Sequence, residues 1–133
     1  MSTHSKTDPL SVKIHPLAAR GIKLFNQGEY YQAHEPLEAA WIETQSPERD
    51  LYQGILQIGL AYYQISQGNY RGALKMFKRG QRNLAPLGET MLGINITRLR
   101  EDARGVEEHL RKAGDSQIEI IKRSIYKPVP LIE

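Results

Sequence analysis

The 133-residue chain contains no cysteine, which excludes a disulfide scaffold, a thiolate zinc site and a cysteine nucleophile. No apolar run approaches the roughly 20 residues that a membrane-spanning helix needs. The opening segment MSTHSKTDPLS also lacks the apolar stretch of a secretory signal. We therefore expect a cytoplasmic protein that does not enter a membrane. The length suits a single domain with a buried core.

Acidic residues are missing from one segment and basic residues are scarce in another. Residues 71–82 hold five bases and no acid, whereas residues 29–50 hold six acids and the single base Arg49. The bases that we single out as a candidate partner-binding face are Lys75, Lys78, Arg79 and Arg82. This face is either a solvated helix surface or a binding surface for an acidic or phosphate-bearing partner. Nucleic acid is not the favoured partner, because the net charge is only +3. In addition, Phe77 is the one aromatic residue among these bases, so the segment lacks a row of rings on which nucleic-acid bases could stack.

Two stretches of the chain repeat each other. LFNQGEYYQAHEPLE at 24–38 aligns without gaps with QISQGNYRGALKMFK at 64–78. Gly28 and Gly68 stand between helix-like patterns, where a glycine can take the left-handed conformation that ends a helix. Each unit is therefore predicted to be a helical hairpin, and the second resembles a tetratricopeptide hairpin. Two units are too few for a solenoid, which favours a compact bundle.

Periodicity and helix-breaking residues predict five helices. Pro16 suits a first helical position, while Pro86 and Gly114 each end a helical pattern. The predicted helices cover residues 16–27, 29–43, 48–67, 69–84 and 95–113. The expected fold class is thus all-α, a compact bundle built from two helical hairpins. We expect a flexible N-terminus at 1–13, one helical domain at 14–115 and an extended C-terminal tail at 116–133, which contains two prolines.

The stretch GEYYQAHEPLEAAW at 28–41 places polar residues where an apolar stripe is expected. A helical wheel puts His34 and Glu38 at the centre of the face expected to be buried, with Glu35 at its margin. Because a buried carboxylate needs a partner, another helix is expected to supply one. Gln53 and Gln57 form a narrow stripe on the helix at 48–67. That stripe either marks the solvent side or faces His34 and Glu38.

The run AHEPLEAAW, followed by SPERDLYQGILQIGLAYYQISQGNYRGA, resembles the bacterial and plastid family catalogued as domain of unknown function 309. The matching residues are Ala33, His34, Glu35, Glu38, Trp41, Gln53, Gly54, Gln57, Gly68, Asn69, Gly72 and Ala73. The resemblance covers roughly residues 25–84. It implies a small all-helical fold but no activity. It also implies a polar set, by which we mean His34, Glu35, Glu38, Trp41, Gln53 and Gln57. Two departures are Gln64, where the family often has histidine, and Pro36, where it usually has an aliphatic residue.

Two interpretations of the polar set stay open. The favoured one is a non-catalytic interaction or scaffold module, with a protein or peptide partner, in which the set is a buried network that fixes packing. The alternative is a small-molecule or metal-dependent enzyme that uses His34, Glu35 and Glu38, with Gln53 and Gln57 as orienting donors. No metal or cofactor is predicted, because one histidine and two carboxylates are a thin ligand set. No catalytic residue is assigned, and a homodimer through the last helix is left open.

Overall fold

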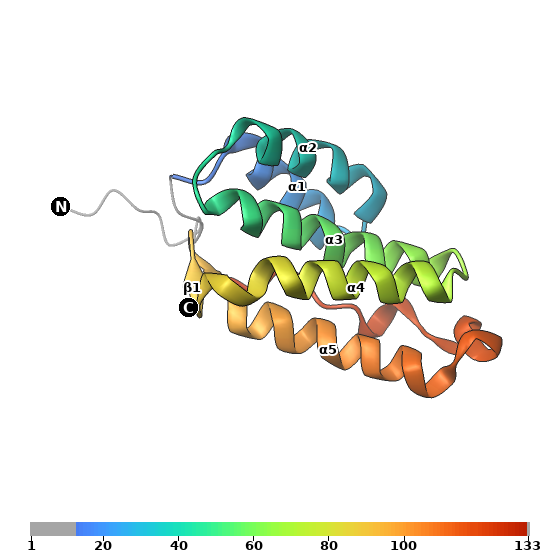
Figure 1. Cartoon of the computed structure of the whole chain (residues 1–133). Coiled ribbons are helices and arrows are strands. Elements are labelled where there is room, and N and C mark those ends of the chain that lie inside the picture. The colour runs from blue at the N-terminus through green and yellow to red at the C-terminus, as the bar shows by residue number, and fades with distance from the viewer. Residues whose placement is uncertain (1–12, 133) are drawn as a thin grey trace.

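The computed structural model describes residues 13–132, so the predicted flexible N-terminus lies almost wholly outside the described residues. The helices are α1 Pro16–Asn26, α2 Tyr30–Glu43, α3 Glu48–Ser66, α4 Tyr70–Leu84 and α5 Ile96–Ala113. Each helix packs mainly on the next one along the chain. The hairpins α1–α2 and α3–α4 therefore stack side by side, and α5 packs against α4 (Figure 1). The predicted all-α bundle is confirmed.

Local signals set the ends of these helices. The N–H of Leu17 donates to Nδ1 of His15 at 3.0 Å, which caps α1 just before its proline. Gly28 and Gly68 have φ of 81° and 73°, so each ends a helix in the left-handed conformation as predicted. Gly114, with φ of 74°, ends α5. All five predicted helices lie within one residue of the observed bounds.

Helix α3 is the centre of the core and crosses α4 at two glycines. A Cβ on Gly54 would lie 2.6 Å from Leu84, and one on Gly80 would lie 2.8 Å from Ile58. Both distances are shorter than side chains tolerate, so the two backbones approach as closely as they do only because neither position carries a side chain. The family-like residue Gly54 is thus explained by packing.

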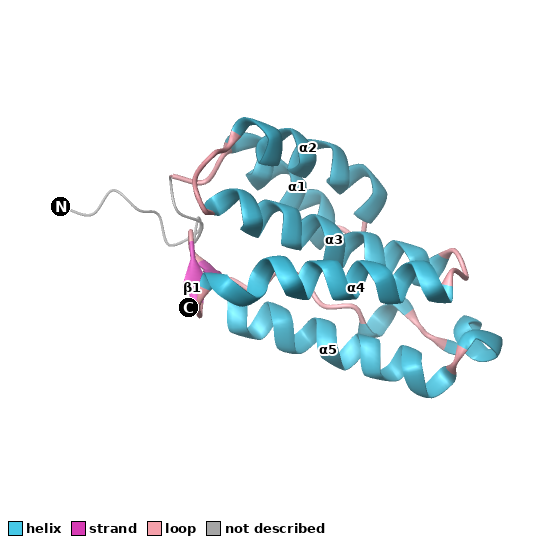
Figure 2. Ribbon diagram, viewed as in Figure 1, coloured by secondary structure: helices cyan, strands magenta, loops and turns pink. Residues whose placement is uncertain are grey.

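A short β-hairpin, absent from our predictions, separates α4 from α5 (Figure 2). The 3₁₀ turn η1 Ala85–Leu87 leads into strands β1 Thr90–Met91 and β2 Ile94–Asn95, which pair antiparallel. Leu92 and Gly93 join the strands with φ of 52° and 83°, the pair of positive values that a type I′ turn requires.

The C-terminal segment, residues 115–132, returns along the bundle and is called the strap below. It contains the 3₁₀ turns η2 Asp115–Ile120 and η3 Arg123–Ile125, and it then runs extended to a β-bridge between Leu131 and Ile94. Figure 1 shows it passing behind α4 and α5 and ending beside the hairpin. The prediction of an extended tail therefore holds for the residues after η3, whereas the part before them turns twice.

Candidate functional site

The residues of the predicted polar set lie on α2 and α3, but they are less buried than expected. Glu38 and Glu35 are exposed, and His34 is half-buried. The expectation that His34 and Glu38 occupy the centre of a buried face is therefore wrong. Their use as a functional site stays a prediction, now of a surface site.

Small residues explain where the buried face of α2 lies. The buried positions of α2 are Ala33, Leu37 and Ala40. On a helical wheel Glu38 lies roughly 120° from the centre of that stripe. Helices α1 and α3 both pack on α2, and a stripe with two alanines lets them approach closely. Tyr30 and Trp41 are half-buried beside this stripe, whereas Tyr31 is exposed.

The imidazole of His34 belongs to a surface patch with two tyrosines. Its Nδ1 lies 2.5 Å from the carbonyl oxygen of Tyr31, to which it donates, and the two rings are 4.9 Å apart. Tyr31 in turn packs on Tyr63 of α3, with ring centroids 5.1 Å apart. With Nδ1 occupied, Nε2 is the nitrogen that His34 presents to a ligand.

Trp41 also lies at the surface edge of α2. It is half-buried, and the guanidinium of Arg49 lies 4.8 Å from its ring centroid. Arg49 is held there by donating to the carbonyl oxygen of Thr44 at 3.0 Å. This cation–π contact joins the start of α3 to the end of α2. Trp41 therefore covers the edge of the core with one face and a guanidinium with the other.

The glutamines of α3 form hydrogen bonds with α4 and its leading turn rather than with α2. Gln57 is buried, and its Oε1 accepts from the amide of Asn83 in α4 at 2.6 Å. Gln64 accepts from Asn69 at 3.0 Å, and Gln53 is half-buried. The structure thus brings Gln57 to Asn83, and no described hydrogen bond joins a glutamine of α3 to His34 or Glu38. Within residues 13–132, no three histidine, aspartate or glutamate side chains gather to hold a metal ion.

The predicted basic residues do lie together on one exposed face, that of α4. Lys75, Lys78, Arg79 and Arg82 are all exposed. The opposite side of α4 is buried through Ala73, Phe77, Gly80 and Leu84. None of the four bases forms an ion pair with any residue of the described chain. We call these four residues the basic face.

A further polar cluster, which sequence reasoning missed, fastens the starts of α1 and α3. Nε2 of His15 lies 2.8 Å from Oε1 of Glu43, and the N–H of His15 donates to the hydroxyl of Tyr52 at 3.0 Å. The hydroxyl of Ser46 donates to Glu48 and holds the pKa of that carboxyl below its usual value. The cluster borders a hollow of about 270 Å³. Its hydrogen bonds join the start of α1 to the end of α2 and to α3, so the cluster holds these three helices together.

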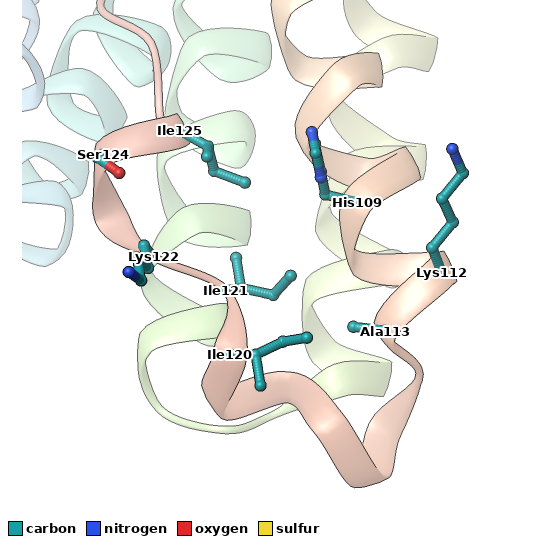
Figure 3. Close-up of a pocket in the computed structure, with 8 residues that line it drawn as sticks. All are labelled: His109, Lys112, Ala113, Ile120, Ile121, Lys122, Ser124 and Ile125. Carbon is teal, nitrogen blue, oxygen red and sulfur yellow. The ribbon is translucent and has the colours of Figure 1, made fainter.

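The strap is the second feature that the sequence pattern did not single out. Tyr126, in its middle, is buried against Tyr62 of α3. Between the strap and α5 lies a hollow of about 370 Å³, in which Ile120, Ile121 and Ile125 of the strap extend toward His109 of α5 (Figure 3). The sequence feature that could have indicated the docking of the strap is the group of apolar residues around the two prolines of the tail.

Part of the chain is similar to known sequences. Residues 18–76 match the family "Domain of unknown function (DUF309)", which confirms the resemblance drawn from the sequence. The chain is also 27% identical over 88 residues to an uncharacterized protein of Aquifex aeolicus (strain VF5). That match spans 63% of this chain but 26% of the relative, so the chain covers about a quarter of the relative's length. The chain is therefore similar to this family over residues 18–76, and its own fold is a small helical bundle.

No helix within residues 13–132 is both long and apolar enough to span a bilayer.

Proposed function

We propose that this chain is a non-catalytic interaction module whose basic face binds an acidic segment of a partner protein. The observation that carries the proposal is the unpaired state of Lys75, Lys78, Arg79 and Arg82 within the described chain. Unpaired like charges on one helix repel one another, and an acidic partner relieves that repulsion. A cytoplasmic location is part of the proposal, because a chain without cysteine fits a reducing compartment.

The geometry of α4 supports a linear partner. The four bases fall within roughly 100° of arc on a helical wheel, and they span about 10 Å along the helix. Helix α4 contains no acidic residue, and packing on α3 fixes its orientation. A partner with carboxylates on successive helical turns matches this face in both sign and spacing.

The match to part of a longer relative also supports a module. In the Aquifex aeolicus protein the similar region is only 26% of the chain, so this kind of domain occurs there beside other sequence. The enzyme alternative has less support, because Glu35 and Glu38 are exposed and Nδ1 of His34 is occupied by its own helix.

Two charge-matched variants test the proposal. The first carries Lys75→Gln, Lys78→Gln, Arg79→Gln and Arg82→Gln. The second removes four exposed bases elsewhere, Arg20→Gln, Lys23→Gln, Arg104→Gln and Lys122→Gln. The probe is a fluorescein-labelled helical peptide with glutamates on one face, and binding is followed by fluorescence anisotropy at low and moderate salt. A DNA duplex with the same label is the second probe.

We expect the first variant to lose about tenfold or more in peptide affinity and the second to bind like the unchanged protein. Equal loss in both variants contradicts the proposal, because net charge alone would then explain the binding. Tighter binding of DNA than of the peptide also overturns it, in favour of a nucleic-acid partner.

A further inference from the structure

The strap is anchored on the bundle through one aromatic ring. The ring of Tyr126 lies 4.8 Å from that of Tyr62, with an interplanar angle of 4°. The ring of Tyr30 meets Tyr126 edge-on at 5.9 Å and 71°. The hydroxyl of Tyr126 lies 3.5 Å from Oγ of Ser66. Residues of α2 and α3 thus form an aromatic socket that holds a single side chain of the strap.

One hydrogen bond on each side of this anchor holds the strap, the first through a strap side chain and the second through the strap main chain. Nη2 of Arg123 donates to the carbonyl oxygen of Gly28 at 2.7 Å, and the guanidinium lies 5.8 Å from the Tyr30 ring. The N–H of Val129 donates to Oδ1 of Asn26 at 2.8 Å. A polar side chain that bonds to the main chain of an extended segment, as Asn26 does here, is typical of peptide-binding domains.

The far end of the strap adds a strand to the hairpin. The N–H of Asn95 donates to the carbonyl oxygen of Pro130 at 2.9 Å, and the N–H of Ile132 donates to that of Gly93 at 2.8 Å. An extended segment that pairs with a sheet edge is the β-augmentation mode of peptide recognition.

The strap lies in a gap that the helices leave open. Helix α5 packs on α4 but makes few contacts with α1 and α3. Within this gap the strap buries Ile118, Tyr126 and Val129, while Arg123 and Lys127 stay exposed. The strap is therefore attached to the helices through a small number of buried side chains.

Open hollows border the strap on both sides. The hollow of about 370 Å³ in Figure 3 adjoins one of about 310 Å³, since both are lined by His109, Ser124 and Ile125. A third, of about 180 Å³, lies on the other side, between Arg123 and the start of α2. Exposed side chains, among them His109, Ser124 and Arg123, line these hollows, so both flanks of the strap face solvent. The strap thus has the contacts of a ligand laid in a groove.

We propose that this groove, formed by Asn26, Gly28, Tyr30, Tyr62 and Ser66, is a peptide-binding surface and that the strap is its resident ligand. The partner is an extended segment of another protein that carries the same anchors. These are an arginine, a tyrosine three residues later and a proline–valine pair beginning two residues after that, as in Arg123, Tyr126 and 128–129. The surface is separate from the basic face. A tethered ligand has an effective concentration in the millimolar range, so the strap occludes the groove in the intact chain.

A cleavable chain tests this proposal directly. Residues 115–117, all exposed, are replaced by a protease recognition sequence, and the full-length protein is cut there. A fluorescent peptide of residues 118–133 is then added, and its anisotropy reports exchange with the resident strap. The comparison peptides carry Tyr126→Ala or, as a matched control, the exposed Ile132→Ala. A fourth peptide keeps only arginine, tyrosine, proline and valine at the strap spacing, with serine elsewhere.

We expect the cut protein to stay folded and to exchange its strap, while the uncut protein binds no peptide. Tyr126→Ala is expected to weaken the peptide by about tenfold or more, and Ile132→Ala to change it little. The anchor-only peptide should compete, and its Tyr→Ser version should not. Loss of near-ultraviolet circular dichroism on cutting, or no exchange, would make the strap part of the core and overturn the proposal. Failure of the anchor-only peptide alone overturns the assignment of the partner. Because the basic-face variant keeps the groove, it should bind these peptides normally, which separates this result from the proposed function.

Discussion

The rings of Tyr126 and Tyr62 lie parallel, 4.8 Å apart, and join the end of the chain to its central helix. Tyr62 also meets Phe25 of α1 and Phe77 of α4 edge-on, both at 5.9 Å. One aromatic cluster therefore links both hairpins and the strap. Because edge-on and stacked pairs add to the effect of burial, this cluster is the place where changes in the strap reach the rest of the fold.

The stacked pair predicts different effects for two substitutions of Tyr126. Tyr126→Ala removes a buried ring and is expected to lower the free energy of unfolding by about 3 kcal/mol. Tyr126→Phe keeps the stacking and loses only the long hydroxyl contact with Ser66, so we expect a change below about 0.5 kcal/mol. Urea unfolding followed by circular dichroism measures both. A Phe variant as unstable as the Ala variant would assign the anchoring to the hydroxyl and contradict ring stacking.

The same tyrosines predict a loss of stability at alkaline pH. Burial raises the pKa of Tyr62, Tyr126, Tyr30 and Tyr52 above the ordinary tyrosine value of about 10. Above that pH the unfolded chain releases protons that the folded chain keeps, so the free energy of unfolding falls as pH rises. This contribution is complete below about pH 10 and is lost as pH climbs toward the raised pKa values.

Denaturant titrations between about pH 8 and 11 measure this slope. Tyr62→Phe removes the most strongly shifted group and should make the slope shallower. Tyr31→Phe is the matched control, because it makes the same substitution at an exposed ring. A slope that is the same in all three proteins would contradict the role of burial.

Two glycines in helices predict opposite effects of the same substitution. A Cβ on Gly21 of α1 would lie 2.5 Å from Cγ of Leu37, in the tight contact between α1 and α2. Gly21→Ala is therefore expected to lower the free energy of unfolding by about 1–3 kcal/mol. Nothing lies within 4 Å of a Cβ on the exposed Gly105 of α5, and Gly105→Ala should raise it by about 0.5–1 kcal/mol. Thermal unfolding of the two variants side by side decides this, and a stabilised Gly21→Ala would refute the close approach of the helices.

The helices were predictable from the sequence because the signals at their ends are local. A proline at the first position of α1, and glycines after α1, α3 and α5, act on their own backbone whatever the rest of the fold does. The β-hairpin was not predictable in this way. Its turn places Leu92 at a positive φ, where asparagine, aspartate or glycine is usual, so the segment carries no common turn signature. Long-range pairing with the strap instead supports it.

The order of the polar residues around α2 was predictable from the sequence, but their exposure was not. A wheel orders the residues of α2 around the axis, yet the arc that is buried depends on which helices flank it. Because α1 and α3 cover the narrow stripe of Ala33, Leu37 and Ala40, Glu38 is left outside it. The basic face lies at the surface because its arc of α4 contains no apolar residue. The docking of the tail as a strap was not predictable, because its buried residues Ile118, Tyr126 and Val129 follow no period that links them to a distant helix.

The exposure of Glu38 predicts how the polar set responds to substitution. Glu38→Gln and His34→Ala remove no buried partner, so each should change the free energy of unfolding by less than about 0.5 kcal/mol. Gln57→Leu has the opposite expectation, because it leaves the amide of Asn83 without its acceptor at the α3–α4 contact and should cost about 1 kcal/mol. Urea unfolding of the three variants measures these changes. If Glu38→Gln destabilised the protein as much as Gln57→Leu, the carboxylate would have a structural partner after all. If instead Glu38→Gln leaves the free energy of unfolding unchanged, Glu38 has no structural role. Any function of this carboxylate then comes from binding at the exposed surface of α2, and that surface becomes the place to look for a second partner.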